Sequence, residues 1–226
     1  MKLSIIIPAY NEADGVTYTA AALHNVLADL RQTYELELIF VNDGSKDNTA
    51  VLLQEAFAAD KDVTVVSHEV NRGLGAAIRT GFKYAKGDIV VTTDFEGTYD
   101  FRTIPELLKY MAKPDVDIVT ASPYHRDGGV RGVPKYRLLF SYGASLLYRV
   151  LVDFRILTWT ALFRAYRRPV VDNVEFGFAV LDADLDTAGR MSRIELQPGG
   201  IHLPVMQGSA YPVTKGIIPH PGNEQR

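Results

Sequence analysis

The chain has 226 residues and contains no cysteine. This absence excludes a disulfide framework, thiol catalysis and zinc held by cysteine thiolates. Long apolar runs are missing as well. The longest uncharged stretch with membrane character, Leu138 to Tyr148, falls well short of the roughly 18 residues that a spanning helix needs. The apolar run after Met1 is too short for a signal peptide, so we expect a protein that is soluble or attached to a membrane surface.

The sequence also has few histidines and a small net charge. The five histidines are scattered, and no two of them have metal-ligand spacing. The formal net charge of −3 argues against nucleic acid as a partner. Positive charge is nevertheless concentrated in residues 122–168, where nine Lys or Arg face only Asp127 and Asp153, a formal +7. This basic block also holds many apolar and aromatic residues, which suits an anionic partner with an apolar part; an ordinary solvated helix face is the alternative.

Strands and helices alternate along the first hundred residues. Short apolar runs rich in β-branched residues predict buried parallel strands, and apolar residues spaced by three and four predict helices between them. Strands are expected at Leu3–Pro8, Leu36–Val41, Val63–Ser67 and Asp88–Thr93, and helices at Val16–Leu30, about Asp47–Ala59 and after Gly75. The pattern predicts an α/β fold with a mostly parallel central sheet and helices on both faces.

The alternation becomes less regular after Asp94. Further elements are expected in the order helix, strand, helix, strand, at Ile104–Met111, Val116–Ala121, Tyr136–Val152 and Leu157–Tyr166. Beyond Asn173, recurrent glycine and proline predict irregular or short β structure.

Polar clusters follow the predicted strands. Ligands of parallel α/β sheets bind at the carboxyl ends of the strands, and the clusters stand at such ends: Tyr10-Asn11-Glu12, Asn42-Asp43, Asn71-Arg72 and Asp94-Phe95-Glu96. The last cluster offers two carboxylates, Asp94 and Glu96, that can reach one divalent cation. Hard oxygen ligands suit Mg²⁺ or Mn²⁺, usually shared with substrate phosphates. Two solvated loop acids are the alternative interpretation.

Two more strand ends suggest nucleotide contacts. Asp43 can accept hydrogen bonds from a base or a ribose, although Asn42-Asp43-Gly44-Ser45 also suits a turn followed by a helix cap. The turn Asn71-Arg72-Gly73-Leu74-Gly75 matches neither the dinucleotide fingerprint nor the P-loop. Its glycines let a helix N-terminus approach a nucleotide or the sheet closely. Arg72 is a candidate phosphate contact there.

The basic block contains a candidate phosphate site. Arg137 and Ser141 are four residues apart, so they share one face of a helix and can hold a phosphate together. Arg126, Arg131 and Arg164 belong to the same block, and we include them as candidate phosphate contacts.

Together these segments resemble the family 2 glycosyltransferases. The resemblance rests on Ser4–Glu12, Val41–Ser45 and Asn71–Gly75, with Asp94-Phe95-Glu96 standing where that family carries its Asp-x-Asp metal motif. The basic block, with Thr158–Arg168, is similar to the polyprenyl (dolichyl) phosphate mannose synthase branch. The likeness covers about residues 3 to 170.

This resemblance implies a GT-A-type nucleotide-sugar-binding fold, inverting transfer, a GDP-mannose donor and a lipid phosphate acceptor. Pro8, Tyr10, Glu12 and Asp43 would line the donor pocket, while Asp94 and Glu96 would hold the metal. Arg137 and Ser141 would hold the acceptor phosphate, together with Arg126 and Arg131. We accordingly interpret the chain as a single glycosyltransferase domain. Residues 1–100 form its nucleotide-binding half, 101–175 its acceptor half, and 176–226 an irregular C-terminal segment.

Three departures from the family pattern stand out. Glu96 replaces the usual second aspartate, Pro123 replaces an arginine found in some members, and the segment after about Phe176 matches poorly. The sequence leaves open a UDP-sugar donor, a saccharide acceptor and a non-catalytic nucleotide-sugar-binding homologue. It does not identify the sugar, the lipid length or the oligomeric state. With no spanning helix expected, a peripheral position on the cytoplasmic membrane face fits a lipid acceptor.

Overall fold

The structure is a computed structural model, and it describes residues 1–114, 116–121, 143, 161–173 and 205–206. The described strands form one sheet in the order β3-β2-β1-β4-β6-β5-β7. Among them only β6 runs against its neighbours β4 and β5. The strands are β1 (Lys2–Ala9), β2 (Glu35–Asn42), β3 (Val63–Ser67), β4 (Ile89–Thr92), β5 (Ile118–Ala121), β6 (Arg164–Arg167) and β7 (Val205–Met206). The predicted α/β fold with a mostly parallel sheet is therefore confirmed.

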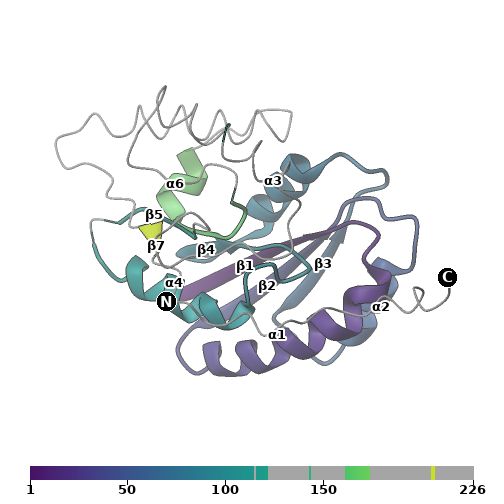
Figure 1. The fold of residues 1–226 in the computed structure, drawn as a ribbon, viewed down its shortest axis with the longest axis horizontal. Helices are drawn as coiled ribbons and strands as arrows, with labels where there is room; N and C mark the ends of the chain where they lie inside the picture. The colour runs from purple at the N-terminus through teal and green to yellow at the C-terminus, as the bar shows by residue number, and fades with distance from the viewer. Residues whose placement is uncertain (115, 122–142, 144–160, 174–204, 207–226) are drawn as a thin grey trace.

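Helices cover both faces of this sheet (Figure 1). They are α1 (Val16–Leu30), α2 (Thr49–Ala56), α3 (Leu74–Tyr84), α4 (Ile104–Met111) and α6 (Arg168–Asn173), with short 3-10 turns η1 (Ala13–Gly15) and η2 (Phe101–Thr103). The layers α1, α2 and α4 lie on one face, and α3 and α6 lie on the other (Figure 1). Among the described residues, no helix is both long and apolar enough to cross a membrane.

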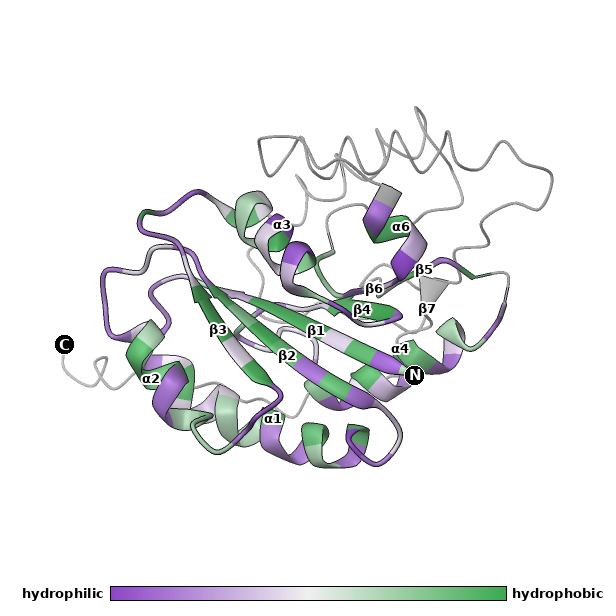
Figure 2. Cartoon of the chain, turned by 180° about the vertical axis from the view of Figure 1, so that it is seen from behind, coloured by the Kyte–Doolittle hydropathy of each residue, from purple (hydrophilic) through white to green (hydrophobic). Residues whose placement is uncertain are grey.

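The apolar strands form two cores, one on each face. Side chains alternate along a strand, so Leu3, Ile5 and Ile7 of β1 join the larger core under α1, whereas Ile6 joins the core under α3. All four of these side chains are fully buried. Figure 2 shows the same contrast, with mostly apolar central strands and helices of mixed polarity. Burial on both faces explains why the strands appear as nearly continuous apolar runs.

The structure corrects two predicted boundaries. The second helix was expected over about Asp47–Ala59, but α2 spans only Thr49–Ala56. Asp47 instead accepts hydrogen bonds from the backbone and the hydroxyl of Thr49 at the start of that helix. The last predicted strand began at Leu157, yet β6 begins at Arg164 and residues 161–163 carry no strand. The predicted helix Tyr136–Val152 lies outside the described residues, apart from the helical Gly143.

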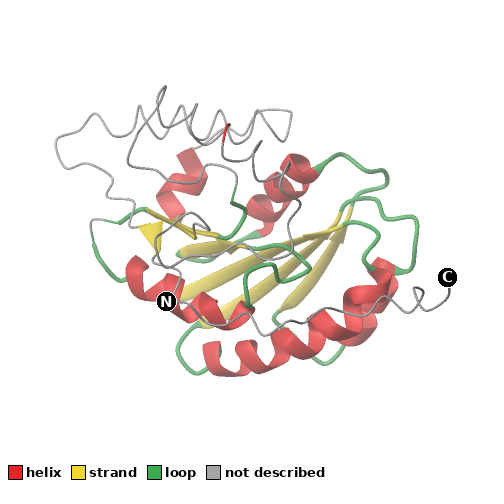
Figure 3. Ribbon diagram, viewed as in Figure 1, coloured by secondary structure: helices red, strands yellow, loops and turns green. Residues whose placement is uncertain are grey.

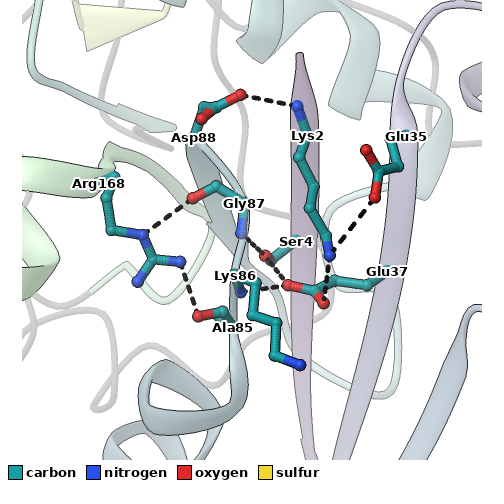
Figure 4. Close-up of polar contacts among 9 residues, drawn as sticks. All are labelled: Lys2, Ser4, Glu35, Glu37, Ala85, Lys86, Gly87, Asp88 and Arg168. Atoms are coloured by element: carbon teal, nitrogen blue, oxygen red, sulfur yellow. Dashed lines mark hydrogen bonds and ion pairs between the residues drawn. The ribbon is translucent and has the colours of Figure 1, made fainter.

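Two adjacent arginines join β6 to helices on opposite faces. Arg167 donates to the carbonyls of Met111, Lys113 and Val116, at and after the end of α4. Arg168 donates to the carbonyls of Ala85 and Gly87, directly after α3 (Figure 4). Carbonyls at a helix end have no partner within the helix, and arginine satisfies them well. These two cations were counted in the basic block, but the structure uses them internally.

A compact polar network lies at the amino ends of β1, β2 and β4 (Figure 4). The Ser4 hydroxyl donates to the Glu37 carboxylate and accepts from the backbone of Gly87. The same carboxylate accepts from the backbone of Lys86 and lies 3.4 Å from the Lys2 ammonium. A half-buried carboxylate is thereby satisfied where three segments of chain meet, as burial of charge requires.

Gly87 allows this close approach, so its replacement tests the network. A Cβ atom at this position would lie 2.5 Å from the Ser4 nitrogen and 2.6 Å from the Ile89 oxygen, both backbone atoms that cannot move aside. We expect Gly87→Ala to lower the free energy of unfolding by about 2–4 kcal/mol. Lys86→Ala, which removes the neighbouring exposed side chain, should change it by less than about 0.5 kcal/mol. Urea denaturation measures both variants; equal stabilities would contradict the tight packing.

Candidate active site

The loops that follow the parallel strands gather at one end of the sheet (Figure 3). Ala9 pairs with Asn42, so β1 and β2 end level with each other, and Ile6 pairs with Thr92 of β4. The predicted polar clusters therefore follow strands that end at a common edge, where sheets of this kind bind ligands. Pro8 is half-buried near the end of β1, and the next residue but one, Tyr10, is 41% exposed.

Four acids from three loops come together at this edge. Burial of Glu12, together with the negative charges of Glu96, Asp47 and Asp94, raises the pKa of the Glu12 carboxyl group above its ordinary value. Like charges exert such an effect only at short range. Glu12 and the two predicted metal ligands, Asp94 and Glu96, lie on loops at the same end of the sheet, and we call this group of acids the acidic edge. Asp47, which the sequence did not single out, is its fourth member.

The acidic edge fits a divalent cation that is shared with a substrate. Its donors are carboxylate oxygens, which Mg²⁺ and Mn²⁺ prefer. One Asp94 oxygen accepts a hydrogen bond from the Thr98 backbone, and Glu96 is exposed. Within the described part of the chain, no three acidic or histidine side chains are arranged to hold a metal by themselves. A cation at this edge would therefore need further oxygens, as phosphates and water supply.

Phe95 anchors the loop that carries both predicted ligands. It is only 4% exposed, and its ring centroid lies 6.3 Å from that of Phe40 in the larger core. The Thr19 hydroxyl of α1 donates to its carbonyl. A Cβ atom on Gly15 would lie 3.3 Å from its ring, so only a small residue at 15 leaves this space. Phe95 points into the core, while Asp94 on one side of it is half-buried and Glu96 on the other side is exposed.

Hydrogen bonds link the first two loops of the site directly. Asn11 donates from its backbone to the Ser45 hydroxyl, and its side-chain oxygen accepts from the backbone of Lys46. The backbone of Glu12 donates to the Thr49 hydroxyl, and that of the next residue donates to Asp47. Asn11 has a φ of 55°, which is uncommon for a residue with a side chain and typical of functional loops. These links fix the backbone that presents Tyr10 and Glu12.

Asp43 has a different role from the acidic edge. It is 4% exposed, and its carboxylate accepts three hydrogen bonds, from the backbones of Arg72 and Gly73 and from His68. Asp43 is not among the acids whose charge raises the pKa of Glu12. The expected turn at 42–45 is present, with Gly44 at a φ of 68° and Asn42 accepting from the backbone of Ser45.

The remaining predicted residues fall into two groups. Arg72 exposes its side chain while Asp43 fixes its backbone. Arg164 is buried in β6 and pairs with Thr92 of β4, two residues before Asp94, so it lies near the loop that carries Asp94 and Glu96. The others lie outside the described residues: Arg126, Arg131, Arg137 and Ser141.

Sequence reasoning did not identify three residues of this edge: His68, Asp47 and Thr49. Asp47 and Thr49 form an Asp-x-Thr helix start, a signal that was available but that indicates a cap rather than a site. His68 follows β3 as Asp43 follows β2, and only the pairing of these strands and the contact between the two side chains relate them.

The fold defines the class of protein. Glucosyl-3-phosphoglycerate synthase from Mycobacterium tuberculosis, solved with Mn²⁺, UDP-glucose and phosphoglyceric acid, has a TM-score of 0.62 at 18% identity, over 86% of this chain and 66% of that one. A mannosyltransferase from Pyrobaculum calidifontis, solved with GDP-Man and Mn²⁺, has a TM-score of 0.55 at 20% identity, over 91% of this chain and 55% of that one. These likenesses show a GT-A-type fold.

The sequence comparisons assign the family. The profile described as Glycosyl transferase family 2 matches residues 4–175, so the chain belongs to that family. A dolichol-phosphate mannosyltransferase of Pyrococcus furiosus is 33% identical over 199 residues, 86% of this chain and 54% of the relative. A polyprenol monophosphomannose synthase of Mycolicibacterium smegmatis is 30% identical over 196 residues, 85% of this chain and 69% of the relative. The chain spans about half the length of several such relatives.

The anchoring role of Phe95 can be tested against a matched core phenylalanine. Phe95→Ala should lower the free energy of unfolding by about 3–5 kcal/mol, since it leaves a cavity. It should also weaken Mn²⁺-dependent nucleotide binding, because the loop loses its anchor. Phe57→Ala removes a ring of equal burial that packs 5.1 Å from Phe40. It should destabilise the fold similarly and leave binding intact. Calorimetry at a temperature where both variants are folded measures this; equal binding by both would contradict the anchor.

Proposed function

We propose that this chain is a catalytic glycosyltransferase domain that transfers a sugar with inversion from a nucleotide diphosphate donor to a polyprenyl phosphate. The donor we propose is GDP-mannose. The acidic edge supports this proposal, because Glu12, Asp94 and Glu96 follow strands that end on the same side of the sheet in a family 2 chain. The Pyrococcus and Mycolicibacterium relatives, a dolichol-phosphate mannosyltransferase and a polyprenol monophosphomannose synthase, support mannose as the sugar and a polyprenyl phosphate as the acceptor.

In this mechanism the protein positions charged groups. A divalent cation, Mg²⁺ or Mn²⁺, would be held by Asp94 and Glu96 and would neutralise the diphosphate leaving group. Pro8, Tyr10, Glu12 and Asp43 line the donor pocket, and Arg72 contacts the donor phosphates. An acceptor phosphate is already an anion, so it attacks the anomeric carbon without a strong general base. Orientation and charge stabilisation are then the main contributions to the rate.

We assign the acceptor phosphate to residues 101–175, the acceptor half. Arg137 and Ser141 hold it, with Arg126, Arg131 and Arg164 as further contacts. Arg164 is the described member of this set, and its place on β6 beside β4 supports a position near the metal loop. The basic block contributes less free charge than its sequence suggests, because Arg167 and Arg168 bind backbone carbonyls. A peripheral position on the cytoplasmic face of a membrane follows from a lipid acceptor.

A direct assay tests the proposal. The purified chain is incubated with a short polyprenyl phosphate and with labelled GDP-mannose, or with UDP-glucose for comparison, in Mn²⁺, Mg²⁺ or a chelator. Labelled sugar should move from GDP-mannose into the lipid phase with either metal and should remain in the aqueous phase with the chelator. Preference for a UDP-sugar would overturn the donor assignment. Metal-dependent binding of GDP-mannose without hydrolysis or transfer would indicate a non-catalytic homologue.

Asp94→Asn tests the metal assignment. The change removes one ligand charge, so Mn²⁺-dependent GDP binding should weaken by more than about 100-fold, since even outer-shell changes cost roughly 10- to 100-fold. Asp100→Asn is the matched control on the same loop, because the Asp100 carboxylate instead holds Arg102. This control should bind GDP as the parent does. Unchanged Mn²⁺-dependent binding by Asp94→Asn, measured by calorimetry, would refute the assignment.

Arg137→Ala tests the acceptor assignment. Loss of a bidentate phosphate contact should raise the KM for polyprenyl phosphate by roughly 10- to 100-fold, because charged hydrogen bonds of this kind are strong. The affinity for the donor should stay the same. Steady-state kinetics with each substrate varied in turn separates the two effects. A loss of donor affinity would show that Arg137 belongs to the donor site and that the acceptor assignment is wrong.

A further inference from the structure

His68 connects three elements at the donor end of the sheet. It follows β3, and its side chain is only 7% exposed. Its Nδ1 atom lies 2.6 Å from Asp43 Oδ1, and its Nε2 atom lies 2.9 Å from the hydroxyl of Thr80 in α3. A buried imidazole with both nitrogens in contact has one defined orientation. His68 therefore helps to fix Asp43, through the same oxygen that accepts from the Arg72 backbone.

Asp43 transmits this constraint to the backbone of the loop before α3. Its two carboxylate oxygens accept from the backbone nitrogens of Arg72 and Gly73, at 2.9 and 2.8 Å. Gly73 has a φ of 87°, a conformation that leaves its segment without the regular hydrogen bonds of a helix or strand. The carboxylate provides the missing partners. We call His68, Asp43 and the two backbone nitrogens the loop clamp.

The loop clamp fixes the backbone from which the Arg72 side chain extends. Its backbone nitrogen is held while its side chain is exposed at the carboxyl edge of the sheet, directly before the first turn of α3. A long arginine side chain contributes most to phosphate binding when its backbone is already ordered, because less entropy is lost on contact. A pre-ordered Arg72 is therefore suited to an anionic donor.

The clamp also reduces the effect of the Asp43 charge. An ionised carboxylate only accepts hydrogen bonds, so the Nδ1 atom of His68 carries the proton and donates it. In the neutral imidazole the Nε2 atom then accepts from the Thr80 hydroxyl. Three donors thus surround the Asp43 carboxylate. This arrangement lets an acid stand near a diphosphate site without repelling the donor as strongly as a free carboxylate would.

We propose that His68 is a positioning residue for the nucleotide diphosphate donor, acting through Asp43 on the 71–73 loop and hence on Arg72. The proposal rests on the proposed function, since it concerns the same donor. It gives Asp43 an organising role in addition to any contact that it makes with the nucleotide. It also gives a role to His68, which the spacing of the five histidines along the sequence did not single out.

Two conservative variants separate the two contacts of the imidazole. In His68→Asn the side-chain amide occupies the position of Nδ1, so the contact with Asp43 is kept and that with Thr80 is lost. In His68→Gln the amide reaches the position of Nε2, so the contact with Asp43 is lost. We expect His68→Gln to weaken GDP binding and to raise the donor KM about fivefold to tenfold, the effect of one lost hydrogen bond to a charged group. For both variants kcat should stay within about twofold, and His68→Asn should resemble the parent in KM.

A double-mutant cycle tests the route through Arg72. In an Arg72→Ala background, His68→Gln should add less than about twofold to the loss of affinity, because coupled residues do not contribute additively. His24→Leu is the matched control, since His24 also lies against a carboxylate, that of Asp60 at 3.1 Å, on the helix layer away from α3. It should lower Tm without changing GDP affinity.

The outcomes distinguish this inference from the proposed function. If the parent chain binds no nucleotide with Mn²⁺, the proposed function fails. If the parent binds and His68→Gln binds equally well, only the clamp fails. Equal losses in His68→Asn and His68→Gln would show a general packing role, and an undiminished effect of His68→Gln in the Arg72→Ala background would show a route that bypasses Arg72. Either result overturns the inference.

Discussion

Mutual repulsion among carboxylates at one edge of the sheet is the constraint on which the rest of the site depends. Burial of Glu12 and the negative charges of Glu96, Asp47 and Asp94 together raise the pKa of Glu12. A folded chain holds like charges together only when the surrounding backbone prevents them from separating. The links between the first two loops and the burial of Phe95 provide that restraint. A divalent cation bound by these acids, as proposed above, would relieve the repulsion.

The two ends of the sheet show how the same polar chemistry can serve opposite purposes. At the amino ends of the strands, Glu37 is satisfied by Ser4, Lys2 and the backbone of Lys86, so no charge is left for a ligand (Figure 4). At the carboxyl ends, the charges of Glu12 and its acidic neighbours reinforce one another. The acid at the amino ends is thus satisfied within the fold, whereas the carboxyl ends carry an acid, Glu96, that is exposed.

Some basic residues of this sequence bind the protein's own backbone, and others are proposed to bind a phosphate. Arg167 and Arg168 occupy the C-terminal ends of α4 and α3, where unpaired helix carbonyls favour cations. Arg167 ends β6 and Arg168 begins α6, and their side chains reach the ends of helices in different layers. A count of charges along the chain cannot distinguish these cations from ones that are available to a lipid phosphate. Only contacts in the folded state make that distinction.

By itself, the sequence determined the alternating strands and helices, the carboxyl-edge position of Asp43 and Asp94, and the family resemblance, because periodicity and strand-end motifs are local properties. It did not determine that β6 runs antiparallel between β4 and β5, or that β6 begins only at Arg164. Nor did it reveal the pairing of His68 with Asp43 or the inclusion of Asp47 in the acidic edge. Tertiary structure decided these features, because each depends on contacts between residues that are distant in the chain, which no local pattern encodes.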